Sequence, residues 1–342
     1  MKRVAGSSCR VAWFAAAILC APLVFAHHSF AEYDFSRSIE LTGTLVEFAW
    51  RNPHIQFKLQ ALPDAQGRVV TWDIEGDSLS VMRRTSVTAE HLKRGDKITI
   101  AGAPSRQSPN RLFVTNLLRA DGVELLLGVG TKPRWPDAPS TFSTSWLDPG
   151  TPSPGSAGLF RVWSSKLDDP VFLWKRTYPL TEEARKTHAR WDPTRDTVTR
   201  GCEPKGMPTI MEQPYPIEFL RKGNLILLRL EEYDAVRTIH MVPTADFKGL
   251  PRTRLGVSAG RWDGRTLVVT TDRIDWLYLD PSGVPLGSAA TLVERFTPSD
   301  DGSSLNYGIT ITSPGVFTEP VELKRNWVWR PKERVQPFKC LG

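Results

Sequence analysis

Residues 39–127 carry short segments in which apolar and polar side chains alternate, as in strands that are buried on one face. In the clearest of them, Ile55, Phe57 and Leu59 fall on one face. The predicted elements are three strands, a helix and two strands: Ile39–Trp50, His54–Gln60, Val69–Glu75, Ser78–His91, Lys97–Ala101 and Leu112–Leu118. This is the order of an OB-fold, so we predict a small OB-like five-stranded barrel. Another five-stranded barrel or roll is the alternative.

The second half of the chain also reads as strands joined by short turns. The candidates are Leu225–Leu230, Val236–Met241, Val257–Trp262, Thr266–Thr271, Thr291–Phe296, Leu305–Thr312 and Val321–Trp329. Asp263 and Gly264 form a two-residue hairpin signal between two of them. One short helix is expected at Thr181–Trp191, where Thr181 can cap the first turn. We therefore predict a mainly β chain whose second part is an antiparallel β-meander forming a barrel or half-barrel.

The first residues have the form of an export signal. Lys2, Arg3 and Arg10 precede an apolar run over Val11–Phe25, and Ala26 fits a small-residue cleavage rule. The run is shorter than the ~20 residues of a spanning helix, which disfavours an uncleaved anchor. We expect cleavage near Ala26, a periplasmic or secreted location, and no transmembrane segment in the mature chain. The domain plan is a signal peptide at 1–26, an OB-like domain at 27–127, a Pro-rich linker at 128–158 and a β-domain at 159–342.

Charge and motifs restrict the function classes. The formal net charge is +7, but between His27 and Leu127 12 basic residues balance 12 acidic ones. Binding to a phosphate backbone needs an excess of basic residues, so we expect no nucleic-acid partner. The chain has no G-x-S-x-G, Walker or C-x-x-C motif, which favours a non-enzymatic protein. A weaker alternative is a carboxylate-dependent hydrolase that would use acidic residues of the second domain: Glu231, Glu232, Asp234, Asp263, Asp272, Asp275 and Asp280.

Two cysteines remain once the signal is removed. Cys202 and Cys340 form an even pair in a chain that we expect in an oxidising compartment, so we predict a disulfide between them. Closing a loop of this length would stabilise the fold by about 4–5 kcal/mol in the entropic description. Two unpaired buried thiols are the alternative.

Several motifs resemble those of a family of exported bacterial domains of unknown function. These domains open with A-H-H-S-F after the signal, as residues 26–30 do here, and carry N-P-H at the start of the second strand, as residues 52–54 do. Trp72–Gly76 and Leu92–Asp96 fit the same family, and the resemblance covers roughly residues 20–127. The rest is similar to an uncharacterised, β-rich C-terminal half of other envelope proteins, through Cys202–Pro208, Glu232–Asp234 with Arg237, and Gly260–Gly264. The resemblance implies location and domain plan, but no reaction.

Histidines at the predicted mature N-terminus suggest a metal site. After cleavage, His27 would offer both its α-amine and its ring to one ion, and His28 and His54 would add imidazoles. Such nitrogen ligands suit Cu(II), so copper is the candidate cofactor. The alternative is that His27 and His28 are merely exposed and that His54 bonds to the backbone.

Aromatic residues of the second domain suggest a pocket for an apolar ligand. Trp327 and Trp329 share one face of a strand; Trp262, Tyr233 and His240 lie on or beside others. Ordinary core packing would explain them equally. We conclude from the sequence that the chain is an exported, non-enzymatic module for a small apolar or amphipathic ligand, with a copper-binding protein as the alternative.

The copper hypothesis has a direct test. Cleavage after Ala26 should create a Cu(II) site that the precursor lacks, because only the mature chain has a free amine on His27. Titration should show binding by the mature form, weaker binding by a form with one extra N-terminal residue, and weaker binding by His54→Ala. Equal binding by all three, or by none, would exclude this site.

Overall fold

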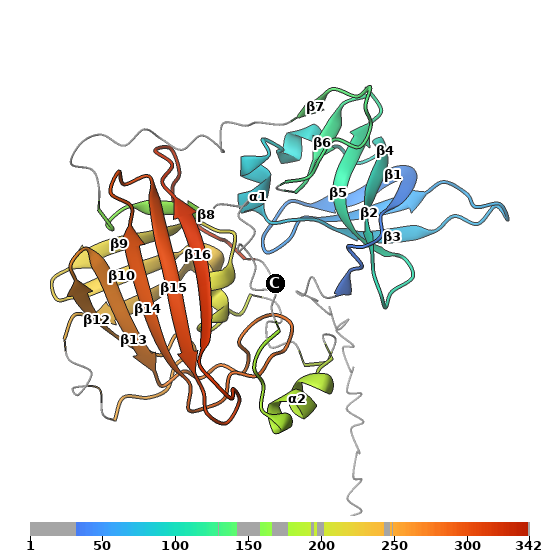
Figure 1. Cartoon of the computed structure of the whole chain (residues 1–342). Coiled ribbons are helices and arrows are strands. Elements are labelled where there is room, and N and C mark those ends of the chain that lie inside the picture. Colours follow the sequence, from blue (N-terminus) through green and yellow to red (C-terminus); the bar gives the residue numbers. More distant parts are fainter. Residues whose placement is uncertain are drawn as a thin grey trace, which may run out of the picture.

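The computed structural model of the chain describes residues 32–128, 130–141, 158–165, 177–192, 195–196, 202–242, 247 and 249–340. They form an OB-like unit and a larger β-barrel that lie side by side (Figure 1). Within the described part, no helix has both the length and the apolar character needed to cross a membrane.

The first unit confirms the OB-like prediction. Its elements are β1 (Ile39–Ala49), β2 (Gln56–Ala61), β3 (Thr71–Glu75), α1 (Leu79–Arg84), η2 (Ala89–His91), β4 (Lys97–Pro104), β5 (Arg111–Arg119), β6 (Glu124–Leu126) and β7 (Ser140–Thr141). The strand order is β3-β2-β1-β4-β5, and a parallel pairing of β3 with β5 closes the five strands into a mixed barrel. Leu45, Leu59, Ile100 and Leu117 are among the fully buried side chains of its core.

One predicted element of this unit differs. The expected helix over Ser78–His91 is divided into α1 and η2. Ser78 caps α1, but Ser86 has a left-handed backbone with φ 59°, which ends the helical path between the two pieces. At the start of the predicted linker, β7 pairs with β6, and the buried Glu124 side chain accepts a hydrogen bond from the Arg134 backbone amide at 2.9 Å. Residues 130–141 therefore pack on the OB unit.

The second unit is a closed barrel of nine strands. Its elements are β8 (Val162–Ser165), α2 (Glu182–Ala189), η4 (Thr209–Glu212), β9 (Ile217–Lys222), β10 (Leu225–Leu230), η5 (Glu232–Asp234), β11 (Ala235–His240), β12 (Val257–Asp263), β13 (Thr266–Asp272), β14 (Thr291–Pro298), β15 (Ser304–Thr312) and β16 (Val321–Val328). The order is β10-β11-β12-β13-β14-β15-β16-β8-β9, and β9 pairs with β10 to complete the ring. All neighbours are antiparallel except β11 and β12, which are parallel.

Side chains fill the barrel at mid-height. Strand alternation buries every second residue of β14 and β16. Phe219, Phe296, Tyr307 and Trp327 form a chain of ring contacts with centroids 4.9–5.2 Å apart. The interior is therefore a packed core.

A buried ion pair lies within this core. Arg237 on β11 forms hydrogen bonds with both carboxylate oxygens of Glu294 on β14, and also bonds to Ser258 and Thr271. The Tyr307 hydroxyl donates to Glu294 at 2.9 Å. Both charged side chains are almost inaccessible to solvent, so each depends on the other for its charge balance.

The OB unit contacts the barrel at β8, where Arg84 donates to the Ser164 hydroxyl at 3.4 Å, and at the segments before β9 and after β10. Arg83 of α1 pairs with Glu231 at 2.6 Å, and Arg84 donates to the Pro214 carbonyl at 2.6 Å. Figure 1 shows α1 on the side of the OB unit that faces the barrel.

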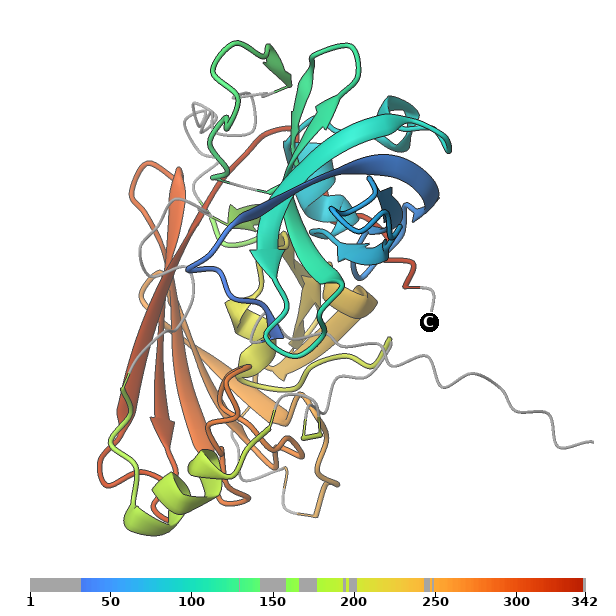
Figure 2. The ribbon, with the colours of Figure 1, turned by 90° about the vertical axis from the view of Figure 1, so that its right-hand side faces the viewer.

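The C-terminal segment also joins the two units. Asn52 of the OB unit donates to the Phe338 carbonyl, and Asp234 of the barrel accepts from the Phe338 amide at 3.0 Å. The predicted disulfide between Cys202 and Cys340 is confirmed and fixes the end of this segment to the barrel unit. Figure 2 shows the segment leaving β16 and passing along the OB unit.

The Arg237–Glu294 pair should be essential for stability. In Glu294→Gln, the arginine keeps its charge in the core without a counter-charge, and we expect a loss of about 3–5 kcal/mol in the free energy of unfolding. Urea denaturation followed by circular dichroism measures this loss.

The control is Arg295→Gln on the same strand, which removes an exposed ion pair with Asp263. It should cost less than about 1 kcal/mol. Equal effects of the two substitutions would contradict the role given to the buried pair.

Candidate functional site

A hollow lies at one end of the barrel. The β9–β10, β12–β13 and β14–β15 turns meet at this end, which we call the mouth. β11 pairs with β12 through only Ile239–Ser258 and His240–Ala259, and β12 then continues to Asp263. The wall is therefore open beyond His240, and a cleft of about 700 Å³ lies there (the mouth cleft).

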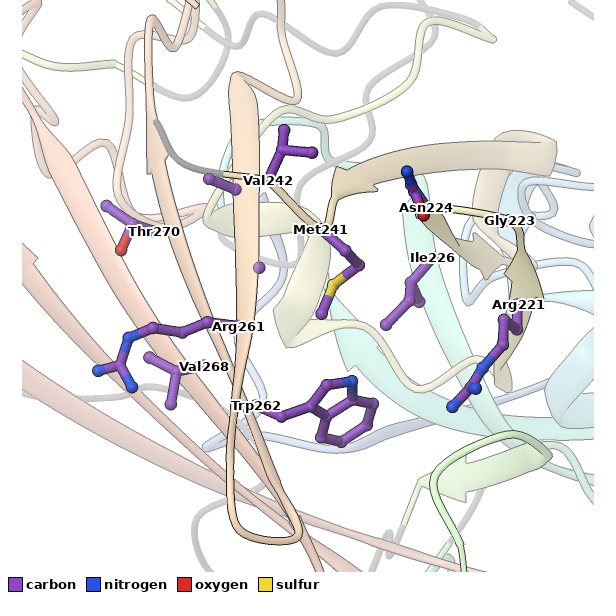
Figure 3. Close-up of a pocket in the computed structure, with 12 residues that line it drawn as sticks. Arg221, Gly223, Asn224, Ile226, Met241, Val242, Arg261, Trp262, Val268 and Thr270 are labelled. Carbon is purple, nitrogen blue, oxygen red and sulfur yellow. The ribbon is translucent and has the colours of Figure 1, made fainter. Parts of the chain in front are cut away.

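Trp262 is the dominant apolar side chain of the mouth cleft. It points from β12 toward the β9–β10 hairpin, with Ile226 and Met241 above it, whereas Arg261 points to the other side of the strand (Figure 3). Gly260 allows Met241 to approach β12, because a Cβ at this glycine would lie 2.6 Å from the Met241 sulfur. Trp262 is 40% exposed, which leaves much of its ring accessible to a ligand.

A second hollow of about 440 Å³, the rim hollow, shares Trp262 and Arg221 with the mouth cleft. Phe160 lines it and contacts Trp262 edge-to-face, with centroids 6.1 Å apart. The Arg221 guanidinium lies 4.7 Å from the centre of the Phe160 ring, a cation–π distance. Arg221, Phe160 and Trp262 thus form one aromatic and cationic cluster between the two hollows.

The arginines of the mouth differ in their partners. Arg265 is bound to Asp300 and to the Pro298 carbonyl. Arg161 donates to the Gly302 carbonyl and lies 4.7 Å above the Trp329 ring, and burial lowers its pKa. Arg221 has no ion-pair partner among the described residues.

The five aromatic and histidine residues expected to form a ligand pocket are dispersed. Trp262 lines the mouth cleft, and Trp329 lies against Arg161. Trp327 belongs to the packed interior, where Arg325 lies 5.0 Å from its ring. His240 alternates with the inward Arg237 and Ile239 on β11 and contacts Phe247 outside the barrel, with ring centroids 5.0 Å apart. Tyr233 follows β10 at the end away from the mouth and packs on Phe338 at 4.9 Å.

Of the three histidines proposed as copper ligands, only His54 is described. His27 and His28 lie outside the described residues. His54 Nδ1 is 2.9 Å from the Gly76 carbonyl and 3.7 Å from a Glu75 carboxylate oxygen, so the ring lies in an acidic surrounding. Among the described residues, no group of three or more His, Cys, Asp or Glu is arranged to hold a metal. The copper site stays a prediction.

Four of the seven acidic residues considered for hydrolysis take separate partners. Glu231 pairs with Arg83, Asp263 with Arg295, and Asp280 accepts from the Tyr178 hydroxyl at 2.9 Å. Glu232 pairs with Lys205 at 2.9 Å. These contacts assign structural roles to the four carboxylates. Hydrolysis stays a prediction, and none of these contacts pairs two carboxylates for acid–base catalysis.

Most residues of the mouth are not among those that the sequence predicts for a site. Phe160, Arg221, Ile226 and Met241 are the ones that only the structure identifies. A signal was present in Ile217–Lys222, where Ile217, Phe219 and Arg221 alternate immediately before the Gly223 turn. This pattern places an arginine on the inner face at the last inward position of a strand.

Comparison with known proteins identifies no activity. Residues 16–112 match the model of DUF6152, a family of unknown function, and the remainder of the chain has no assigned family. No curated protein matches the sequence. Two structures of the S. cerevisiae mitochondrial single-stranded DNA-binding protein Rim1 (form 2) are similar to 25% of this chain. The first has 12% sequence identity to this chain and a TM-score of 0.21, and the match covers 95% of that structure's chain. The second, which is selenomethionine-labelled, has 15% sequence identity and a TM-score of 0.20, and the match covers 97% of its chain.

The carboxyl group of Glu232 should make stability depend on pH. Burial raises its pKa, while Lys205 acts to lower it. Above the unfolded value of about 4.3 and below the raised folded value, the folded chain binds more protons than the unfolded chain. Stability from this group therefore increases as pH falls through this window and is lost as pH rises. Relative to Glu232→Gln, the wild type should gain stability between pH 7.5 and 4.5 in urea denaturation.

Glu203→Gln serves as the control, because the Glu203 carboxylate is 56% exposed and pairs with Arg254 on the surface. Its difference from the wild type should change little with pH. A constant difference for Glu232→Gln over the same range would contradict the expected linkage.

Proposed function

We propose that the chain is an exported, non-enzymatic binding protein and that the barrel mouth holds a small apolar or amphipathic ligand. The observation that carries the proposal is Trp262, a large aromatic side chain that is 40% exposed on the wall of a cleft of about 700 Å³. Small-molecule sites in proteins occupy roughly 300–1,000 Å³ and are lined mainly by apolar and aromatic side chains.

The packing of the barrel restricts where such a ligand would bind. The interior contains Trp327, Phe296 and the Arg237–Glu294 pair, all buried. A ligand would therefore lie above this core, on Trp262 and Met241, with the buried Ile226 beneath them. Covering Trp262 and Met241 removes apolar surface from water, which is the favourable term for association.

Export is the second part of the proposal. The disulfide between Cys202 and Cys340 supports it, since disulfides form and persist in oxidising compartments. The basic and apolar residues of the predicted signal at 1–26 lie outside the described residues. The disulfide and the predicted signal sequence together favour a periplasmic or secreted location.

Replacement of Trp262 tests the binding site. Trp262→Ala should weaken binding of the neutral apolar dye N-phenyl-1-naphthylamine about tenfold or more, which is about 1.4 kcal/mol, because the largest contact surface of the cleft is lost. Titration of dye fluorescence measures the affinity.

The control is Leu277→Ala, which removes another exposed apolar side chain at the end of the barrel away from the mouth. It should leave the affinity unchanged. Unaltered binding by Trp262→Ala would show that the mouth is not the binding site.

A further inference from the structure

We infer that the ligand is an anionic amphiphile: an apolar chain or ring with one terminal oxyanion, which Arg221 binds. This inference rests on the proposed function and names the class of ligand. It depends on the position of Arg221, on the lack of a counter-charge for it among the described residues, and on the apolar surface beside it.

The position of Arg221 follows from strand alternation. Ile217 and Phe219 on β9 face the barrel core, and Phe219 is fully buried. Arg221 is the next inward residue, so its side chain stands above the core at the mouth, and it lines both hollows. Lys222 follows it on the outer face.

The charge of Arg221 is available to a ligand. Among the described residues it forms no hydrogen bond or ion pair. The acidic residues of the mouth turns have other partners: Asp300 pairs with Arg265, Asp263 pairs with Arg295, and Asp301 accepts hydrogen bonds from Ser299 and Ser303. A guanidinium presents a planar set of N–H donors that matches a carboxylate or phosphate with two parallel hydrogen bonds. Phe160 lies under the guanidinium at 4.7 Å and supports its orientation.

The apolar part of the ligand would lie beside this charge. Figure 3 shows the Arg221 side chain extending toward the side of the cleft on which Trp262 lies, with Ile226 and Met241 above Trp262 in this view. A neutral chain would contact only the apolar surface of the cleft, whereas a chain that ends in an oxyanion would contact this surface and the Arg221 guanidinium. The shared chemistry is the oxyanion, whether carboxylate or phosphate.

A pair of matched ligands separates the contribution of the apolar surface to binding from that of the Arg221 charge. Decanoate and decanol have the same chain length and differ in charge, and both can displace the naphthylamine dye. The wild type should bind decanoate about tenfold more tightly than decanol. Arg221→Gln should remove this preference and leave decanol binding unchanged, and Trp262→Ala should weaken both. Decyl phosphate, tested beside decanoate, distinguishes the two oxyanions.

Lys222→Gln is the matched control, since it removes the same charge from the adjacent residue on the outer face of β9. It should keep the preference for decanoate. Loss of the preference in Lys222→Gln as well would show a general effect of charge and overturn the role of Arg221. Equal binding of decanoate and decanol by the wild type would overturn the inference while the proposed function stands, and binding of neither would overturn the proposed function itself.

Discussion

The barrel has an odd number of strands, and the rest of the candidate site depends on this constraint. A closed ring of nine strands cannot alternate in direction throughout, so at least one neighbouring pair must be parallel. Here that pair is β11 and β12. A parallel pair cannot be joined by a tight turn and needs a longer crossover, which in this chain is the segment 241–256. The two strands share only two residue pairs, so the wall opens beside them. The mouth cleft is therefore a consequence of how the ring closes.

The contacts away from the mouth hold the two units together. Arg83 and Asn52 from the OB unit, Glu231 and Asp234 from the barrel, and the C-terminal segment around Phe338 form one connected set of polar and covalent links. These links lie at η5 and β8, while the three turns of the mouth carry none of them. Among the described residues, the contacts between the two units therefore lie away from the cleft, which is compatible with ligand exchange there.

The sequence predicted strands better than it predicted the site. Alternation in β14 and β16, the presence of a tight turn at Gly264 and the pairing of Cys202 with Cys340 could all be inferred, because each depends on local pattern or on chemistry alone. β8 was missed because it has only four residues. Depth in the barrel could not be inferred either: Trp262 and Trp327 both face inward near the end of a strand, yet one lies at the mouth and the other in the core. Their depths depend on the register of all nine strands.

Two arginines on the inner face of the barrel lie at different depths and differ in how their charge is balanced. Arg237, at mid-height, is removed from water and is neutralised by Glu294, with Ser258 and Thr271 satisfying further donors. A charge at that depth requires an internal partner, because desolvation without one costs several kcal/mol. Arg221, higher on the same inner surface, is exposed, so water can solvate it in the free protein, and the described residues supply no carboxylate. An oxyanion that arrives with an apolar chain would bring the missing counter-charge as the chain covers Trp262 and excludes water. The contrast between the two arginines is the physical basis for expecting the anion to come from the ligand.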